Sequence, residues 1–221
     1  MILVDKKILI TAGPTYEPID PVRFIGNRSS GKMGYAIAES LAAKGAKVVL
    51  VSGPSNCKLS NENIQLIKVE TAQEMYDACH KVFKNIDIAI LSAAVADYTI
   101  EKPSKIKIKK KKDDGDELVL RLTKTKDILK SLGAIKTIKQ ILVGFALETN
   151  NEEENALKKL KAKNLDFIVL NSLKDKGAGF AHDTNKITIL DKYNKTRKFE
   201  LKSKLEVAED IASYLENFKL L

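Results

Sequence analysis

The sequence has few cysteines and histidines, the residues that form disulfides and bind structural metal ions. Its 221 residues include two cysteines and two histidines, so neither a disulfide framework nor a Cys/His zinc site is expected. No Ser/His/Asp or Cys/His set suggests a hydrolase nucleophile. No apolar run approaches the ~18 residues of a membrane span, and the first residues lack a signal-peptide pattern. We therefore expect a cytoplasmic protein without a membrane partner.

The chain also offers little to a nucleic acid, although its net charge is +9. It has no Trp, and six of its lysines fall within residues 105–112, followed at once by four acids in 113–117. Six positive and four negative charges leave +2 over residues 105–117. Nucleic-acid binding needs basic residues spread over one face, or aromatic side chains among them. No nucleic-acid partner is therefore expected.

Short apolar segments alternate with amphipathic ones along the chain. Strands are predicted at 6–12, 47–53, 65–70, 87–94, 141–148 and 166–172, with a half-exposed strand at 117–124. Helices are predicted at 31–45, 72–84, 126–136, 151–164 and 204–219, and a C-terminal hairpin at 186–192 and 197–202. This alternation indicates an α/β fold with a parallel sheet, and no linker divides it, so we expect one domain over residues 1–221.

Local signals mark the ends of some of these elements. Thr71 and Glu74 predict a capping box, Ser203 predicts a helix start, and Gly45 predicts a helix end. The loop 13–31 holds three of the five prolines, which predicts no regular structure there. Ligands bind beyond the carboxyl ends of parallel strands, so we expect a site in the loops that follow the strands.

The first candidate for chemistry is the segment 26–34, GNRSSGKMG, at the start of the first predicted helix. Its glycines, two serines and helix N-terminus suit an anion. The spacing is not that of a dinucleotide fingerprint, and Met33 after Gly31-Lys32 excludes a Walker loop. The residues alone support a phosphate site and a structural turn about equally.

Three further candidates have equally plain structural explanations. Asp97, after the small residues of 91–96, suits a ribose, a base amine or a metal, or caps a turn. The lysines of 105–112 suit a loop that brings a cation onto a phosphate, or a solvated edge. Lys159 and Lys163, four residues apart, suit a polyphosphate or simply end a helix. Taken one by one, the structural explanations are favoured.

Several segments together resemble one enzyme family. They are ITAGPTYEPIDPVRFIGNRSSGKMG, AAVADY, KIK, VGFALETN, KNLDFIVLN and GFAHDTN, in this order. They are similar to phosphopantothenate–cysteine ligase (phosphopantothenoylcysteine synthetase). In many bacteria this ligase is the C-terminal half of a bifunctional coenzyme A biosynthesis protein with a flavin-dependent decarboxylase half. The decarboxylase segment has no counterpart here, and a free-standing ligase and an excised domain both stay open.

The resemblance implies a Rossmann-like, mostly parallel sheet with helices on both faces, and a homodimer. It implies that 4′-phosphopantothenate reacts with CTP to give an acyl-cytidylate and pyrophosphate, and that L-cysteine then displaces CMP. Mg²⁺ is the implied cofactor, and no FMN is expected in this chain. Association with a separate phosphopantothenoylcysteine decarboxylase stays open, and the residues themselves do not decide between CTP and ATP.

The resemblance also assigns site residues. Asn27 matches the family's essential asparagine and is expected to hold the acyl carbonyl, beside Arg23 and the segment Ser29, Ser30 and Gly31 as substrate-binding residues. The implied CTP contacts are Leu91, Ser92, Ala93, Asp97, Lys105, Lys126, Asp127, Ile128, Leu129, Phe145, Lys159 and Lys163. For Lys159 and Lys163 this assignment replaces the structural explanation. Lys126 stands where the family has proline, and no metal ligands are identified.

The catalytic flap lysine of the family falls in the KIK pattern. Lys105 follows Pro103 with the family's P-x-K spacing and is favoured, whereas counting back from Gly115 favours Lys107, so both are candidates. Two other functions stay open. A regulatory protein that binds a nucleotide without catalysis would need neither Asn27 nor a flap lysine, and a nucleic-acid-binding protein would show tight duplex binding at physiological salt.

Overall fold

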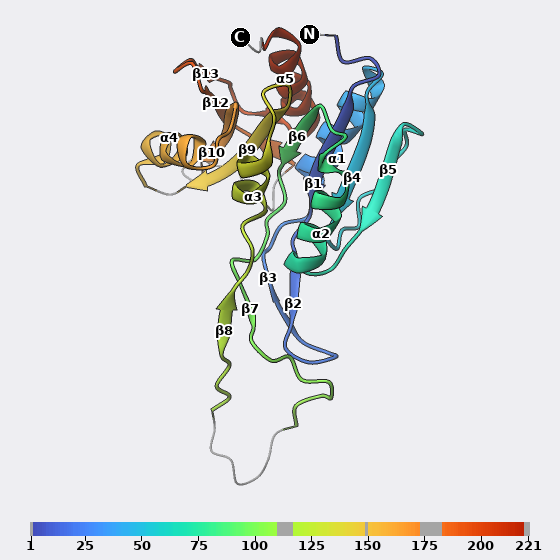
Figure 1. Cartoon of the computed structure of the whole chain (residues 1–221), viewed down its shortest axis with the longest axis vertical. Helices are drawn as coiled ribbons and strands as arrows, with labels where there is room; N and C mark the ends of the chain where they lie inside the picture. Colours follow the sequence, from blue (N-terminus) through green and yellow to red (C-terminus); the bar gives the residue numbers. More distant parts are fainter. Residues whose placement is uncertain (1, 110–116, 149, 173–182, 219–221) are drawn as a thin grey trace.

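The computed structural model describes residues 2–109, 117–148, 150–172 and 183–218. Its centre is an eight-stranded sheet (Figure 1). The strands are β1 (Lys7–Ala12), β4 (Lys47–Ser52), β5 (Ile64–Lys68), β6 (Ile88–Leu91), β9 (Ile141–Glu148), β10 (Phe167–Ser172), β12 (Ile187–Asp191) and β13 (Thr196–Lys198). Their order is β13-β12-β10-β9-β6-β1-β4-β5.

The sheet is mostly parallel, as predicted. The β10–β12 and β12–β13 pairings are antiparallel, and every other pairing within this sheet is parallel. The predicted C-terminal hairpin is confirmed by β12 and β13, although its second strand ends at Lys198. The short strands β11 (Thr184–Asn185) and β14 (Lys202–Ser203) pair with each other in a separate two-stranded sheet.

Helices cover both faces of the sheet. Successive strand residues point to opposite faces, so the unbroken apolar run of β1 contributes to two cores, with Ile8 and Ile10 in one and Leu9 in the other. The first core is covered by α1 (Lys32–Ala43) and α5 (Lys204–Asn217), the second by α2 (Ala72–Phe83), α3 (Ile128–Ile135) and α4 (Glu152–Ala162).

The predicted helix ends are confirmed. Thr71 and Glu74 form a capping box at α2, and Ser203 and Glu206 form another at α5. Gly45 follows α1 with a φ of +86°, a left-handed conformation that glycine adopts without strain. Within the described part of the chain, none of the helices has the length and apolar character needed to cross a bilayer.

The loop 13–31 contains a hairpin, so the prediction of no regular structure there is wrong. Strand β2 (Tyr16–Pro18) pairs antiparallel with β3 (Phe24–Gly26). Pro18 is the last residue of β2 and Pro21 lies in the turn, where the missing N–H of proline is tolerated. The prolines therefore shape the hairpin and do not prevent it.

The prediction of a half-exposed strand over 117–124 is also wrong, both in the length of the strand and in its exposure. Only its last residues form a strand, β8 (Leu122–Lys124), which pairs with β7 (Tyr98–Ile100) outside the main sheet. All three residues of β8 are exposed. The alternating pattern therefore belongs to a two-stranded ribbon whose β8 residues are not covered by other elements.

The hairpin β2–β3 and the ribbon β7–β8 extend together from the body of the molecule (Figure 1). Strand β2 packs beside β7, which joins the two pairs of strands. We call these four strands, the turn between β2 and β3, and residues 101–109 the arm. Three predicted site residues, Arg23, Lys105 and Lys107, belong to the arm and therefore lie away from the main sheet.

A buried carboxylate, Asp166, ties together the amino ends of β9 and β10. It is 0% exposed, and its oxygens lie 2.7 Å from Lys136 Nζ and 2.9 Å from Lys192 Nζ. Leu142 N donates a further hydrogen bond at 2.8 Å. Removing one partner of a buried ion pair leaves an uncompensated charge.

Replacing Asp166 with Asn is expected to lower the free energy of unfolding by about 3–5 kcal/mol. Lys136 would keep its charge at a site where its side chain is almost fully buried. Urea unfolding followed by circular dichroism measures the change. The control is Asp5→Asn, which breaks an exposed pair with Lys47; equal shifts of the two unfolding midpoints would contradict the prediction.

Candidate functional site

Hydrogen bonds join the carboxyl ends of β1 and β6 at the middle of the sheet. Ala93 N donates to the Thr11 hydroxyl at 3.2 Å, and the Ser92 hydroxyl donates to Thr11 O at 2.6 Å. These contacts fix the exit of β6, where Leu91, Ser92 and Ala93 are predicted to lie along a nucleotide. The small side chains there leave room above the strand end.

A cleft of about 650 Å³ opens at this edge of the sheet, and we call it the main cleft. Its walls come from the exit of β6, the segment before α3, the end of β9 and the end of α4. The predicted residues that line it are Asn27, Leu91, Ala93, Asp97, Lys126, Asp127, Ile128, Leu129, Phe145 and Lys163. The structure thus brings together residues from separate parts of the sequence.

Asn27 lies where the arm meets the main cleft. Its side-chain nitrogen donates to Ala94 O at 2.9 Å and to Val95 O at 3.2 Å. The amide group is therefore held by the main chain that follows β6. A hydrogen bond from this nitrogen to an acyl carbonyl competes with these two contacts.

The segment before α3 forms another wall of the main cleft. Thr125 N donates to Asp97 O at 3.0 Å, which ties this segment to the loop after β6. Asp127 is the N-cap of α3 and accepts a hydrogen bond from Lys130 N at 2.9 Å. Lys126 precedes this cap, so a lysine in place of the family's proline leaves the start of the helix intact.

Lys163 pairs with Asp127 across the cleft wall, with Nζ 2.9 Å from Oδ2. Partial burial acts to raise the pKa of Asp127, but hydrogen bonds from Lys163 and from Lys130 N outweigh it and lower the pKa below its ordinary value. Asp127 is therefore ionised at neutral pH. The pair places a lysine ammonium at the cleft while balancing part of its charge.

A smaller cavity of about 160 Å³, the inner cavity, adjoins the main cleft, and the two share Ala93, Ala94, Phe145 and Leu147. Phe145, in the second half of β9, lines both of them. The predicted residues on the other walls of the inner cavity are Ser29, Ser30, Gly31 and Ser92. The cavity also takes in the N-terminus of α1, whose first amides favour an anion.

Three residues that line the inner cavity were not predicted from the sequence: Asn171, Asn185 and Lys204. Lys32, from the predicted segment 26–34, lines it as well. Lys204 is only 8% exposed, and its burial, followed by the nearby charge of Lys32, lowers its pKa. A lysine at the start of an amphipathic helix gives no sign in the sequence that it is buried. Asn171 and Asn185 could have been found, because each is the last residue of a segment that resembles the family.

Four predicted residues are not brought into either cavity by the described structure. Arg23, Lys105 and Lys107 belong to the arm, where Arg23 pairs with Asp20 at 2.6 Å. Lys159 pairs with Glu148, at the end of β9. The CTP and substrate roles of all four stay predictions.

Carboxylates are sparse at the site. Within residues 2–109, 117–148, 150–172 and 183–218, no three His, Cys, Asp or Glu side chains group as a metal site. The main cleft offers Asp97 and Asp127, and Asp127 is paired with Lys163. Mg²⁺ bound with a nucleotide takes most of its ligands from phosphate and water and only one or two from carboxylates, so these residues fit it.

Comparison with protein families supports the family resemblance that the sequence motifs indicate. The family model for the DNA/pantothenate metabolism flavoprotein C-terminal domain matches residues 3–218. The chain belongs to this family. The match takes in every element that lines the main cleft and the inner cavity.

Relatives of this family domain are longer proteins. A cysteine/cysteine sulfinic acid decarboxylase from an unknown prokaryotic organism is 56% identical over 206 residues, covering 93% of this chain and 56% of that protein. The coenzyme A biosynthesis bifunctional protein CoaBC of Bacillus subtilis (strain 168) is 48% identical over 209 residues, covering 95% and 50%. The chain therefore spans about half the length of the curated relatives it matches.

Solved structures share the fold of this family domain. The crystal structure of the C-terminal domain of the coenzyme A biosynthesis bifunctional protein CoaBC superposes with a TM-score of 0.81 at 42% identity, covering 98% of this chain and 97% of that one. A Cab2 variant in complex with phosphopantothenate-cysteine has a TM-score of 0.74 at 18% identity, covering 96% and 87%. The second likeness shows the fold alone.

Proposed function

We propose that this domain is a coenzyme A biosynthesis ligase that joins 4′-phosphopantothenate to L-cysteine and cleaves CTP to CMP and pyrophosphate. The observation that carries the proposal is the main cleft, where Asn27, the exit of β6, the start of α3, Phe145 and Lys163 meet. Family membership and the similarity to CoaBC support the same class of reaction.

In the first step a carboxylate oxygen of 4′-phosphopantothenate attacks the α-phosphorus of CTP. The bond from that phosphorus to the bridging oxygen breaks, pyrophosphate leaves, and an acyl-cytidylate forms. Two anions must approach each other, so positive charge and amide donors contribute more than a base does. The cleft supplies Lys163 and Lys126, and the flap lysine is proposed to add its charge at the transition state.

In the second step the amine nitrogen of L-cysteine attacks the acyl carbon. The acyl carbon–oxygen bond breaks, CMP leaves with that oxygen, and the nitrogen loses a proton as the amide forms. Asn27 is proposed to donate a hydrogen bond to the acyl oxygen, which gains negative charge during this attack. Mg²⁺, when bound with the nucleotide, supplies charge neutralisation at the phosphates, and Asp97 is the cleft carboxylate suited to hold it.

We also propose that the domain works as a homodimer, with the arm as the candidate interface. Val22, Phe24, Tyr98 and Leu122 expose about half or more of their surface on the arm. Phe24 stacks on Tyr16 with ring centroids 3.8 Å apart. Large apolar side chains gathered on one projecting element are typical of a protein–protein interface.

The test of the function is pyrophosphate release. The purified protein, checked for folding and for the mass of a dimer, is given Mg²⁺, 4′-phosphopantothenate and either CTP or ATP, with and without L-cysteine. We expect release with CTP that accelerates when L-cysteine is added, because the amine removes the acyl-cytidylate and frees the site. Mass spectrometry of the cysteine reaction is expected to show the amide product.

The outcomes separate the alternatives. Release with ATP and not with CTP would overturn the choice of nucleotide and leave the ligase. Silence with both nucleotides in a folded dimer would overturn the ligase and favour a nucleotide-binding protein without catalysis. Calorimetry with CTP in the absence of 4′-phosphopantothenate then shows whether the nucleotide binds.

A further inference from the structure

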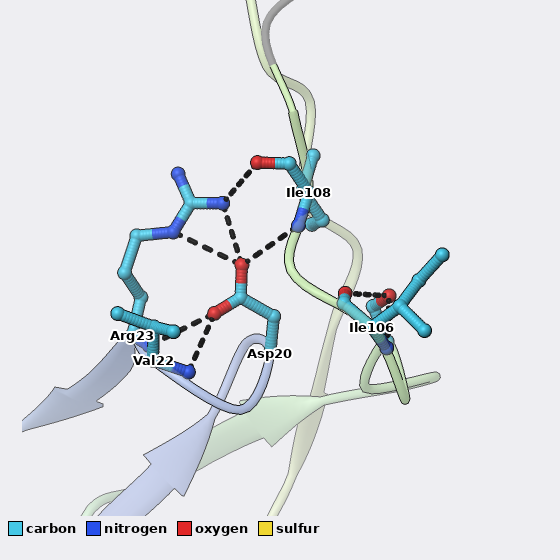
Figure 2. A network of polar contacts seen from close by, with 6 residues as sticks. Asp20, Val22, Arg23, Ile106 and Ile108 are labelled. Atoms are coloured by element: carbon cyan, nitrogen blue, oxygen red, sulfur yellow. Dashed lines mark hydrogen bonds and ion pairs between the residues drawn. The ribbon is translucent and has the colours of Figure 1, made fainter.

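A buried carboxylate in the arm, Asp20, collects donors from two chain segments. It lies in the turn between β2 and β3, and its Oδ1 accepts hydrogen bonds from Val22 N and Arg23 N, both at 2.9 Å. Its Oδ2 accepts from Arg23 Nη2 at 2.6 Å, from Arg23 Nε at 3.1 Å and from Ile108 N at 3.1 Å. Figure 2 shows this carboxylate at the centre of the network.

The segment 104–108 is fastened to that same turn at both of its ends. At one end Ser104 N donates to Ile19 O at 2.9 Å. At the other, Ile108 N donates to Asp20 and Arg23 Nη2 donates to Ile108 O at 3.0 Å. We call residues 104–108 the flap segment. Its ends are set by the β2–β3 turn, although Arg23 and Ile108 are 85 residues apart in sequence.

Both candidate flap lysines lie between these two attachment points. Lys105 and Lys107 are exposed, so their side chains are not held in place by packing against the rest of the protein. The main-chain position of each therefore depends on the contacts at Ser104 and Ile108. The charge on Asp20 strengthens the second contact, because the hydrogen bonds to an ionised acceptor are shorter and stronger than neutral ones.

Only a carboxylate can serve all of these donors. Five N–H hydrogen bonds converge on its two oxygens. An asparagine at this position would keep one acceptor oxygen and would turn an amide NH₂ toward either the guanidinium or the main-chain donors. The side chain of Asp20 is fully buried, so water cannot replace the lost acceptor.

We propose that Asp20 is a positioning residue for the first chemical step, because it fixes the flap segment that carries the charge-stabilising lysine. This inference rests on the proposed ligase function. Asp20 acts through the flap segment and does not line the main cleft. Its loss therefore misplaces a cation and leaves the nucleotide walls unchanged.

The test is Asp20→Asn in the full chain, measured by hydrogen exchange and by kinetics. The amides of residues 104–108 are expected to exchange about tenfold faster, because Ile108 N loses a charged acceptor. The kcat for pyrophosphate release is expected to fall about 10–100-fold, a part of the ~100–1,000-fold that removal of an electrostatic group costs. The KM for CTP is expected to stay within about twofold.

The matched control is Asp210→Asn, which breaks a partly buried ion pair at 2.8 Å between Asp210 on α5 and Lys202 in β14. It is expected to change neither the exchange of residues 104–108 nor kcat. Asp20→Glu keeps the charge but moves the oxygens by one methylene, so it is expected to give an intermediate loss. If Asp20 served only the stability of the fold, Asp210→Asn would lower kcat as much as Asp20→Asn does, provided that the two variants lower the unfolding midpoint equally.

A double-mutant cycle decides whether Asp20 acts through the flap lysine. In the background of Lys105→Gln or Lys107→Gln, whichever slows the first step more, adding Asp20→Asn is expected to cost less than about threefold further. Independent, multiplying effects in the cycle would overturn the inference, as would an unchanged kcat in Asp20→Asn. Silence of the unsubstituted protein in the same assay is the separate failure of the ligase proposal.

Discussion

Replacing Lys105 with Gln is expected to slow pyrophosphate release from CTP by about 100–1,000-fold. Gln keeps the polarity of the side chain but removes the charge that the transition state of the first step needs, since negative charge builds as the carboxylate meets the α-phosphate. The measurement is the single-turnover rate of pyrophosphate release with saturating CTP. Substrate binding is expected to change little, because the main cleft is built by other elements.

Two lysines near Lys105 provide the controls, one within the flap segment and one just after it. Lys109→Gln removes the same charge from the same stretch, beyond the attachment point at Ile108, and is expected to cost less than about threefold. Lys107→Gln tests the other alignment of the KIK pattern. A large loss of rate in Lys107→Gln with a small one in Lys105→Gln would show that Lys107 is the flap lysine. Equal losses of rate in all three variants would mean that the net charge of the stretch matters and not the position of one lysine.

The body of the fold follows from local sequence because its signals agree with one another. The apolar runs of β1, β6, β9 and β10 are long enough to be buried on both faces, and the helices between them have one apolar side. Capping residues such as Thr71 and Ser203 then fix where helices start. Periodicity and caps act over a few residues, so a single sequence is enough to predict them.

The arm does not follow in the same way because its structure depends on partners distant in sequence. Pro18 and Pro21 indicate a break in regular structure, yet they occupy the end and the turn of a hairpin. The alternation in 117–124 predicts a long strand, but only the part that finds β7 becomes one. No local rule reports whether a neighbouring strand is present.

The site divides along the same line. Residues at strand exits and helix starts, such as Ala93 and Asp127, reach the main cleft because the sheet places them there. Lys204 was missed because its burial depends on α1 and the loops that pack around it. The resemblance implies a substrate-binding role for Arg23, and the structure adds its hydrogen bonds to Asp20 and to Ile108 O. These bonds join two parts of the arm that are distant in sequence, so no motif indicates them.

Replacing Asn27 with Asp is expected to leave the first step largely intact and to cripple the second. Pyrophosphate release in the first turnover is expected to stay within about tenfold of the original, whereas amide formation falls by about 100–1,000-fold, the usual cost of losing a donor to a developing oxyanion. A carboxylate cannot donate a hydrogen bond to the acyl oxygen, and its charge opposes the negative charge that forms there. The measurement is a pair of single-turnover assays, one for pyrophosphate and one for the amide product.

The structure makes this prediction stricter than the motif alone. Asn27 also donates to Ala94 O and Val95 O, so both carbonyls would repel the carboxylate introduced by Asn27→Asp. This repulsion at the exit of β6, where CTP is proposed to bind, is the reason that a loss of up to about tenfold is expected in the first step. Asn27→Ser keeps a donor and adds no charge, so it is expected to harm the first step less than Asn27→Asp does. The control is Asn63→Asp, which adds the same charge just before β5, at the opposite edge of the sheet. Equal loss of both steps in Asn27→Asp and Asn27→Ser would mean that the side chain serves to hold the loop after β6, and the acyl carbonyl would need another donor.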